Sequence, residues 1–152
     1  MTRIREEVTI RAPAAAVWHA VHVDLENLPR WAGYVKRAEA LDGRPGKNWR
    51  VRYHLQLPGG FDGSLTLLHT VWDPPRRCAG RFEGGPLHGE WSYTYSEQAG
   101  STRLVYEMDY QLAGLLRFAG GMLSGQYAEG IEKAMASLKS YLEEGDGRSA
   151  AG

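Results

Sequence analysis

Trp49-Arg50-Val51-Arg52-Tyr53-His54-Leu55-Gln56-Leu57 is the stretch that decides the fold class of this chain. Apolar and aromatic side chains occupy every second position, and polar or charged ones stand between them. This period is typical of a β-strand with one buried and one solvated face. The same alternation governs residues 91–95 and 104–110. Turns rich in Gly and Pro separate these runs, so we predict an antiparallel meander.

The remaining strands follow from the same pattern. Leu65, Leu67, His69 and Val71 continue the alternation until Asp73-Pro74-Pro75 interrupts it, and a short strand covers residues 77–83. A first strand is predicted over residues 3–11, where β-favouring residues end at Ala12-Pro13.

Two short helices are predicted between the first strand and the meander. Pro13 suits the first turn of a helix over residues 14–21, where its missing N–H is not needed. Asp24 is expected to cap a second helix that reaches about Gly33, with Pro29 kinking it.

The last element is predicted to be a long helix from about Leu112 to Glu144. One stripe of this helix is apolar: Leu116, Ala119, Leu123, Tyr127, Gly130, Ile131, Ala134, Leu138, Tyr141 and Leu142. Glycines loosen its first half, because each one costs about 1 kcal/mol against Ala in a helix interior. We expect residues 1–144 to form one domain and residues 145–152 to be a disordered tail.

Composition excludes several classes of function. The 152 residues fit one domain, and the 18 basic and 18 acidic residues cancel, which argues against a nucleic-acid partner. No apolar run reaches the length of about 18 residues that a membrane span needs, and the charged N-terminus does not resemble a signal peptide. We therefore expect a cytoplasmic protein without membrane insertion. The single cysteine, Cys78, excludes an internal disulfide and is expected to be an inert core residue.

The order of the predicted elements resembles the superfamily of START lipid-transfer domains and the birch-pollen allergen. Within it, the sequence is similar to the polyketide cyclase/dehydrase and lipid-transport group. The matching stretches are residues 8–13 leading into Val17-Trp18, residues 24–31, 73–77 and 100–104, and Leu138-Lys139. The resemblance implies an α+β helix-grip fold, in which a curved antiparallel sheet of about seven strands wraps a long C-terminal helix. It also implies a hydrophobic small-molecule ligand held in a cavity between sheet and helix.

The dry face of the sheet carries aromatic side chains with polar tips, which favours a ligand cavity. The alternative is a tightly packed aromatic core. The candidate ligand-binding residues are Trp31, Tyr53, His69, Trp91, Tyr93, Tyr106, Met122 and Leu123.

His69 and Tyr53 are the best candidates for catalysis, because imidazole titrates near neutrality and a phenol can polarise a carbonyl. Several aromatase/cyclases of the group carry an Arg directly after a His on a central strand. Thr70 occupies that position here, so the cation that would stabilise an enolate is missing. Those enzymes also carry a Tyr at the end of the second helix, where this chain has Val35, with Tyr34 one residue away.

Three functions are therefore carried forward. We favour a binder or carrier of a lipid, quinone or polyketide-like aromatic over a cyclase/dehydratase. The third alternative is a partner-binding module that uses Leu115, Phe118 and Met122, for example in a homodimer contact. No cofactor is expected.

The pair His19 and His22, and the carboxylate of Glu6, are not expected to belong to the functional site. His19 and His22, three residues apart on the first helix, lack a third ligand nearby in sequence, so no metal site is predicted. Glu6 shares the parity of the apolar residues on the first strand, and we expect it to be solvated at a sheet edge.

Overall fold

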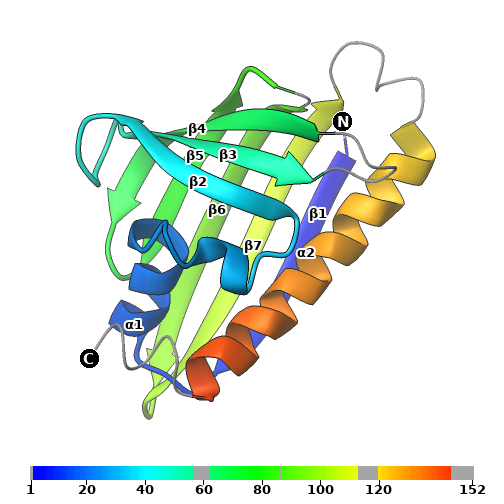
Figure 1. Cartoon of the computed structure of the whole chain (residues 1–152). Helices are drawn as coiled ribbons and strands as arrows, with labels where there is room; N and C mark the ends of the chain where they lie inside the picture. Colours follow the sequence, from blue (N-terminus) through cyan, green and yellow to red (C-terminus); the bar gives the residue numbers. More distant parts are fainter. Residues whose placement is uncertain (1, 57–61, 86, 113–119, 145–152) are drawn as a thin grey trace.

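The computed structural model describes residues 2–56, 62–85, 87–112 and 120–144, and the strands of this part form one antiparallel sheet (Figure 1). The strands are β1 (Thr2–Ile10), β2 (Val35–Asp42), β3 (Arg50–Gln56), β4 (Asp62–Asp73), β5 (Arg77–Glu83), β6 (Leu87–Gln98) and β7 (Ser101–Leu112). Their order across the sheet is β1-β7-β6-β5-β4-β3-β2. The predicted meander is confirmed, and β1 extends it as an edge strand beside β7.

The predicted alternation along β4 is interrupted near its C-terminal end. Leu65, Leu67 and His69 are buried as predicted. A β-bulge then shifts the register, because His69 pairs with Gly80 whereas Val71 already pairs with Ala79. The prediction that Val71 continues the buried series is wrong, since the bulge reverses the parity of the strand. Trp72 takes the inward position instead, with its ring centroid 5.4 Å from that of His69.

The segment between β1 and β2 is helical but more irregular than predicted. It contains α1 (Ala14–Trp18), the π-helical turn η1 (His19–Val23) and the 3₁₀ turn η2 (Leu28–Arg30). The expected helix from Asp24 to Gly33 is therefore wrong in extent. Asp24 caps no helix there; its carboxylate accepts two hydrogen bonds from the Asn27 amide, at 3.1 and 2.9 Å. Pro29 lacks an N–H, which favours a single tight turn over a continuous helix.

The C-terminal helix α2 (Gly120–Glu143) crosses the side of the sheet that the strands curve around (Figure 1). The predicted start at Leu112 is wrong, because Leu112 is the last residue of β7. Of the predicted stripe, Ile131, Ala134, Leu138, Tyr141 and Leu142 are buried, whereas Tyr127 and Gly130 are half-buried. The predicted tail, residues 145–152, lies outside the described residues, so the domain limits stay a prediction.

Polar contacts at the end of α2 attach the helix to β1. The Glu143 carboxylate accepts hydrogen bonds from the Lys139 ammonium at 2.5 Å and from the Arg11 backbone N–H at 2.9 Å. These bonds lower the pKa of Glu143 to about 2. Lys139 also donates to the Thr9 carbonyl at 2.7 Å. The helix is thus fixed at its C-terminal end.

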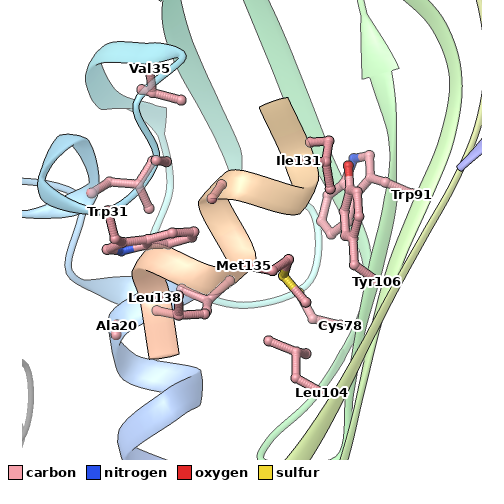
Figure 2. Close-up of a cluster of buried hydrophobic side chains, with 14 of the residues drawn as sticks. Ala20, Trp31, Val35, Cys78, Trp91, Leu104, Tyr106, Ile131, Met135 and Leu138 are labelled. Carbon is pink, nitrogen blue, oxygen red and sulfur yellow. The ribbon is translucent and has the colours of Figure 1, made fainter. Parts of the chain in front are cut away.

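The core lies between α2, the short helices and the sheet. In Figure 2, Trp31 from the η2 segment and Leu138 from α2 lie close to Ala20, and Met135 points toward Cys78 on β5. Cys78 is a free, fully buried thiol, as predicted. Gly80 beside it tolerates no side chain, because a Cβ there would lie 1.9 Å from the Leu68 carbonyl oxygen. Among the described helices, none combines the length and hydropathy that a membrane crossing requires.

Candidate functional site

A pocket of about 410 Å³ lies between α2 and the inner face of the sheet. Its described lining is mostly apolar and aromatic: Gly33, Tyr34, Tyr53, Leu55, Gln56, Leu65, Leu67, Phe82, Leu87, Trp91, Tyr93, Tyr106, Met108, Tyr127, Gly130 and Ile131. Strands β3 to β7 contribute one wall, and α2 contributes the other. Figure 2 shows Ile131 of the helix facing Trp91 and Tyr106 of the sheet.

The pocket gathers part of the set predicted from the sequence. Its lining contains the predicted Tyr53, Trp91, Tyr93 and Tyr106. Trp31 is buried in the core instead, and His69 lies outside the lining. The side chains of Met122 and Leu123 lie outside the described part of the structure, as do Leu115 and Phe118. A role in ligand binding stays a prediction for each of these residues.

Five tyrosines and one glutamine give the described lining its polar character: Tyr34, Tyr53, Tyr93, Tyr106, Tyr127 and Gln56. Tyr93 and Tyr106 lie with ring centroids 4.6 Å apart. Burial raises the pKa of Tyr34 to about 12 and raises the pKa values of Tyr53, Tyr93 and Tyr106 as well. The hydroxyl groups are therefore protonated at neutral pH and can donate hydrogen bonds.

These hydroxyl groups have few partners within the protein. The Tyr106 hydroxyl donates to the Met108 sulfur at 3.2 Å, a weak acceptor. Those of Tyr34, Tyr53 and Tyr93 make no hydrogen bond to another residue of the described ranges. None of the described lining residues carries a charge at neutral pH. The pocket thus offers neutral donors in apolar surroundings.

Sequence reasoning missed several lining residues. Tyr34 lies in the loop before β2. The only signal for it in the sequence is that related aromatase/cyclases carry a tyrosine one residue away, at the position of Val35. Tyr127, a member of the predicted apolar stripe, lines the pocket, and burial raises its pKa to about 12. Gln56 was placed on the wet face of its strand, yet it too belongs to the lining.

His69 lies behind the pocket wall. Its ring centroid is 5.2 Å from that of Trp91, and its Nδ1 is 2.9 Å from the Trp49 carbonyl oxygen. A carbonyl can only accept, so Nδ1 carries the proton and Nε2 is unprotonated in the neutral ring. Burial lowers the pKa of His69, and the hydrogen bond to Trp49 opposes this shift only in part. His69 is thus a neutral imidazole at pH 7.

His22 is the neighbour of His69 that the sequence did not indicate. It is buried, and its Nε2 lies 2.7 Å from the Tyr95 hydroxyl oxygen. Burial lowers the pKa of His22 well below its ordinary value, and the nearby His69 adds to the shift. His19, considered with it as a metal pair, is only half-buried.

His22, His69 and Cys78 form a compact group from three separate elements, η1, β4 and β5. One nitrogen of each imidazole and the thiol sulfur all lie within 4.8 Å of one another. All three residues are buried, and burial raises the pKa of the Cys78 thiol. Among the described residues, this is the group whose atoms suit a metal ion.

Glu6 occupies the edge strand, as expected, but it is not fully solvated. Its side chain is half-buried, and burial raises its pKa, with a smaller contribution from Glu132 on α2. This carboxylate lies away from the pocket lining and is not part of the candidate site.

Solved structures of other proteins share this fold. A protein of Thermus thermophilus superposes with a TM-score of 0.79 at 21% identity, covering 95% of this chain and 99% of the other. A START superfamily protein of Mycobacterium smegmatis gives 0.73 at 19% identity, covering 92% and 98%. An aromatase/cyclase of a Streptomyces species also gives 0.73 at 19% identity, covering 95% and 98%. The chain therefore has the helix-grip fold of START-like proteins.

The sequence itself identifies the family. A family model described as polyketide cyclase/dehydrase and lipid transport matches residues 1–143, and the chain belongs to this family. A search among curated proteins found no match. Membership supports hydrophobic ligand binding or polyketide cyclisation as the general function.

Proposed function

We propose that the protein binds a planar, hydrophobic small molecule carrying carbonyl or hydroxyl oxygens, such as a quinone or polyketide-like aromatic, in the pocket beneath α2. The observation that carries the proposal is the set of neutral tyrosine hydroxyls without strong partners in the described apolar lining. Such a site leaves its donors unpaired unless a ligand or water accepts from them.

The size of the pocket limits the ligand. A cavity of about 150 Å³ lined by apolar side chains accommodates one benzene ring. The volume of about 410 Å³ therefore suits a ligand of two to three rings. The aromatic walls, Trp91 with Tyr93 and Tyr106, favour a flat ring system over a flexible acyl chain.

A carrier is favoured over a cyclase by the chemistry of the lining. Aldol closure of a poly-ketone requires a base that removes a proton next to a carbonyl. The described lining holds tyrosines with raised pKa values and no carboxylate or imidazole. It supports binding and polarisation of a carbonyl but supplies no base.

The proposal is tested with the wild-type protein and a matched ligand pair. Naphthoquinone and naphthalene have similar ring systems, but only the quinone has acceptor oxygens. Native mass spectrometry and quenching of tryptophan fluorescence should give one quinone per chain, bound more tightly than the hydrocarbon. The double change Tyr53→Phe and Tyr93→Phe should reduce this preference, because it removes two of the donors and preserves the apolar lining.

Tyr110→Phe is the control, because Tyr110 is buried outside the pocket lining and its hydroxyl has no partner among the described residues. It should bind both ligands as the wild type does. Absence of binding by either ligand, or equal affinity for both, would contradict the proposal. Turnover of a poly-ketone mimic above background would instead favour the cyclase.

A further inference from the structure

We infer that His22, His69 and Cys78 form a binding site for a soft, monovalent metal ion, Cu(I), directly behind the ligand pocket. The inference rests on the three buried side chains whose ligand atoms lie within 4.8 Å of one another. They come from η1, β4 and β5, so the fold, rather than any local motif, assembles the site.

The hydrogen bonds of the two imidazoles have the pattern of metal-ligating histidines. Such histidines usually donate their second ring N–H to a carbonyl or another oxygen, which fixes the tautomer and orientation of the ring. His69 does so through Nδ1 to the Trp49 carbonyl at 2.9 Å. The Tyr95 hydroxyl oxygen lies 2.7 Å from Nε2 of His22 and accepts from it in the tautomer that carries the proton on Nε2. These bonds leave Nε2 of His69 and Nδ1 of His22 available as ligands.

The spacing requires only a small contraction. Nitrogen and sulfur ligands bonded to one metal at 2.0–2.3 Å lie about 3.5 Å from one another. The three atoms here lie within 4.8 Å of one another, so each pair would have to approach by at most about 1.3 Å to close the site.

Charge and ligand type select the metal. The thiolate of Cys78 would be the single anion, since no carboxylate belongs to this group in the described ranges. Cu(I) with one thiolate is neutral, whereas Zn²⁺ would leave one positive charge among buried aromatic rings, which is costly. Thiolate and imidazole ligands also suit Cu(I), and Met135, a further soft side chain, points toward Cys78 from α2 (Figure 2).

The pocket provides the route to the site. The ring of His69 lies 5.2 Å from that of Trp91, and the ring of His22 lies 4.8 Å from that of Tyr93. Both aromatic residues line the pocket, so movement of one ring connects the group with it.

The test is an anaerobic titration of the reduced wild-type protein with the Cu(I)–bicinchoninate complex. We expect one Cu(I) per chain to be withdrawn from the chelator. X-ray absorption of the loaded protein should show one sulfur and two nitrogen neighbours. Cys78→Ser should weaken binding at least about 100-fold, because it replaces a soft thiolate with a hydroxyl. Tyr95→Phe, which removes the partner of His22, should weaken it about 10-fold.

His88→Ala is the matched control, because His88 is exposed on β6 and should not affect binding. The inference is overturned if the wild type withdraws no copper, or if folded Cys78→Ser binds copper as the wild type does. Binding of Zn²⁺ with equal or higher affinity overturns the assignment to a monovalent ion. If circular dichroism shows that Cys78→Ser is unfolded, the X-ray absorption spectrum of the copper-loaded wild type is the deciding test. Absence of a sulfur neighbour in that spectrum overturns the inference.

Discussion

Replacement of Gly130 by Phe should fill part of the pocket without disturbing the fold. Gly130 lies on α2 in the pocket lining, and a Cβ at this position meets no atom within 4 Å. A benzene ring occupies a cavity of about 150 Å³. The ring introduced by Gly130→Phe would therefore take about a third of the 410 Å³ available. A ligand of two to three rings would no longer fit.

The same change should stabilise the protein. Removal of a helical glycine contributes up to about 0.5 kcal/mol when Phe replaces it. Burial of the ring against the apolar lining adds part of the roughly 1.5–3 kcal/mol that a fully buried Phe contributes. Together, the two contributions should raise the free energy of unfolding by about 1–2 kcal/mol. Urea denaturation measures this gain, and titration with anilinonaphthalene sulfonate measures the loss of binding, expected to be at least about tenfold, or 1.4 kcal/mol.

Gly125→Phe is the control for this experiment. Gly125 lies on the same helix, is exposed outside the pocket lining, and also has open space at its Cβ. Its free energy of unfolding should rise only by the contribution from removing a helical glycine, and its affinity for the probe should be unchanged. If Gly130→Phe binds the probe as tightly as Gly125→Phe does, or is less stable than the wild type, the assignment of the pocket beneath α2 is refuted.

Two further predictions concern stability. Tyr95→Phe should lower the free energy of unfolding by about 1–3 kcal/mol, because it leaves a ring nitrogen of buried His22 without its partner. Urea denaturation should show a lower midpoint with an unchanged slope, and an unaltered midpoint would contradict the prediction. The stabilisation from Glu143, whose pKa is lowered to about 2, should be complete above the ordinary value of 4.5 and disappear as the pH falls toward 2. The difference in stability between wild type and Glu143→Gln should therefore shrink over this range, and a constant difference would argue against the contacts with Lys139 and Arg11.

The sheet was predictable because burial of one face imposes a period of two on every strand. Val51 and Leu55 on β3, Trp49 directly before it, and Trp91 and Tyr95 on β6 are buried as this period requires. The later half of α2 was predictable for the analogous reason, since its buried positions recur with the helical period.

The sequence-based predictions were wrong where the residue pattern does not reveal a local structural feature. The bulge after His69 inserts one residue into β4 and thereby exchanges Val71 for Trp72 on the inner face. Nothing in the alternation before or after it marks the inserted position. Likewise, the start of α2 was misplaced because Leu112 fits a helical stripe and a strand equally well, and its pairing with Leu87 on β6 decides between them.

The candidate sites differ in how far the sequence could indicate them. The aromatic face was recognisable from Tyr53, Trp91 and Tyr93, since they share one strand parity. His22 and Cys78 were not recognisable as partners of His69, because the fold brings together η1, β4 and β5 from distant parts of the chain. The spacing of His19 and His22 brings together two imidazoles at most, whereas the topology of the fold sets the compact group of three ligands.

The bulge on β4 affects the position of His69 relative to the pocket, which matters for catalysis. By turning Trp72 inward, it places an indole against His69, whose ring also lies beside Trp91 and is fixed by the Trp49 carbonyl. His69, the strongest candidate for a general base, is thereby held outside the pocket lining. The described lining offers protonated tyrosines, which can donate hydrogen bonds to an oxygen-bearing ligand. The arrangement separates ligand recognition from the imidazole–thiol group, which is why we interpret the first as a binding site and the second as a metal site.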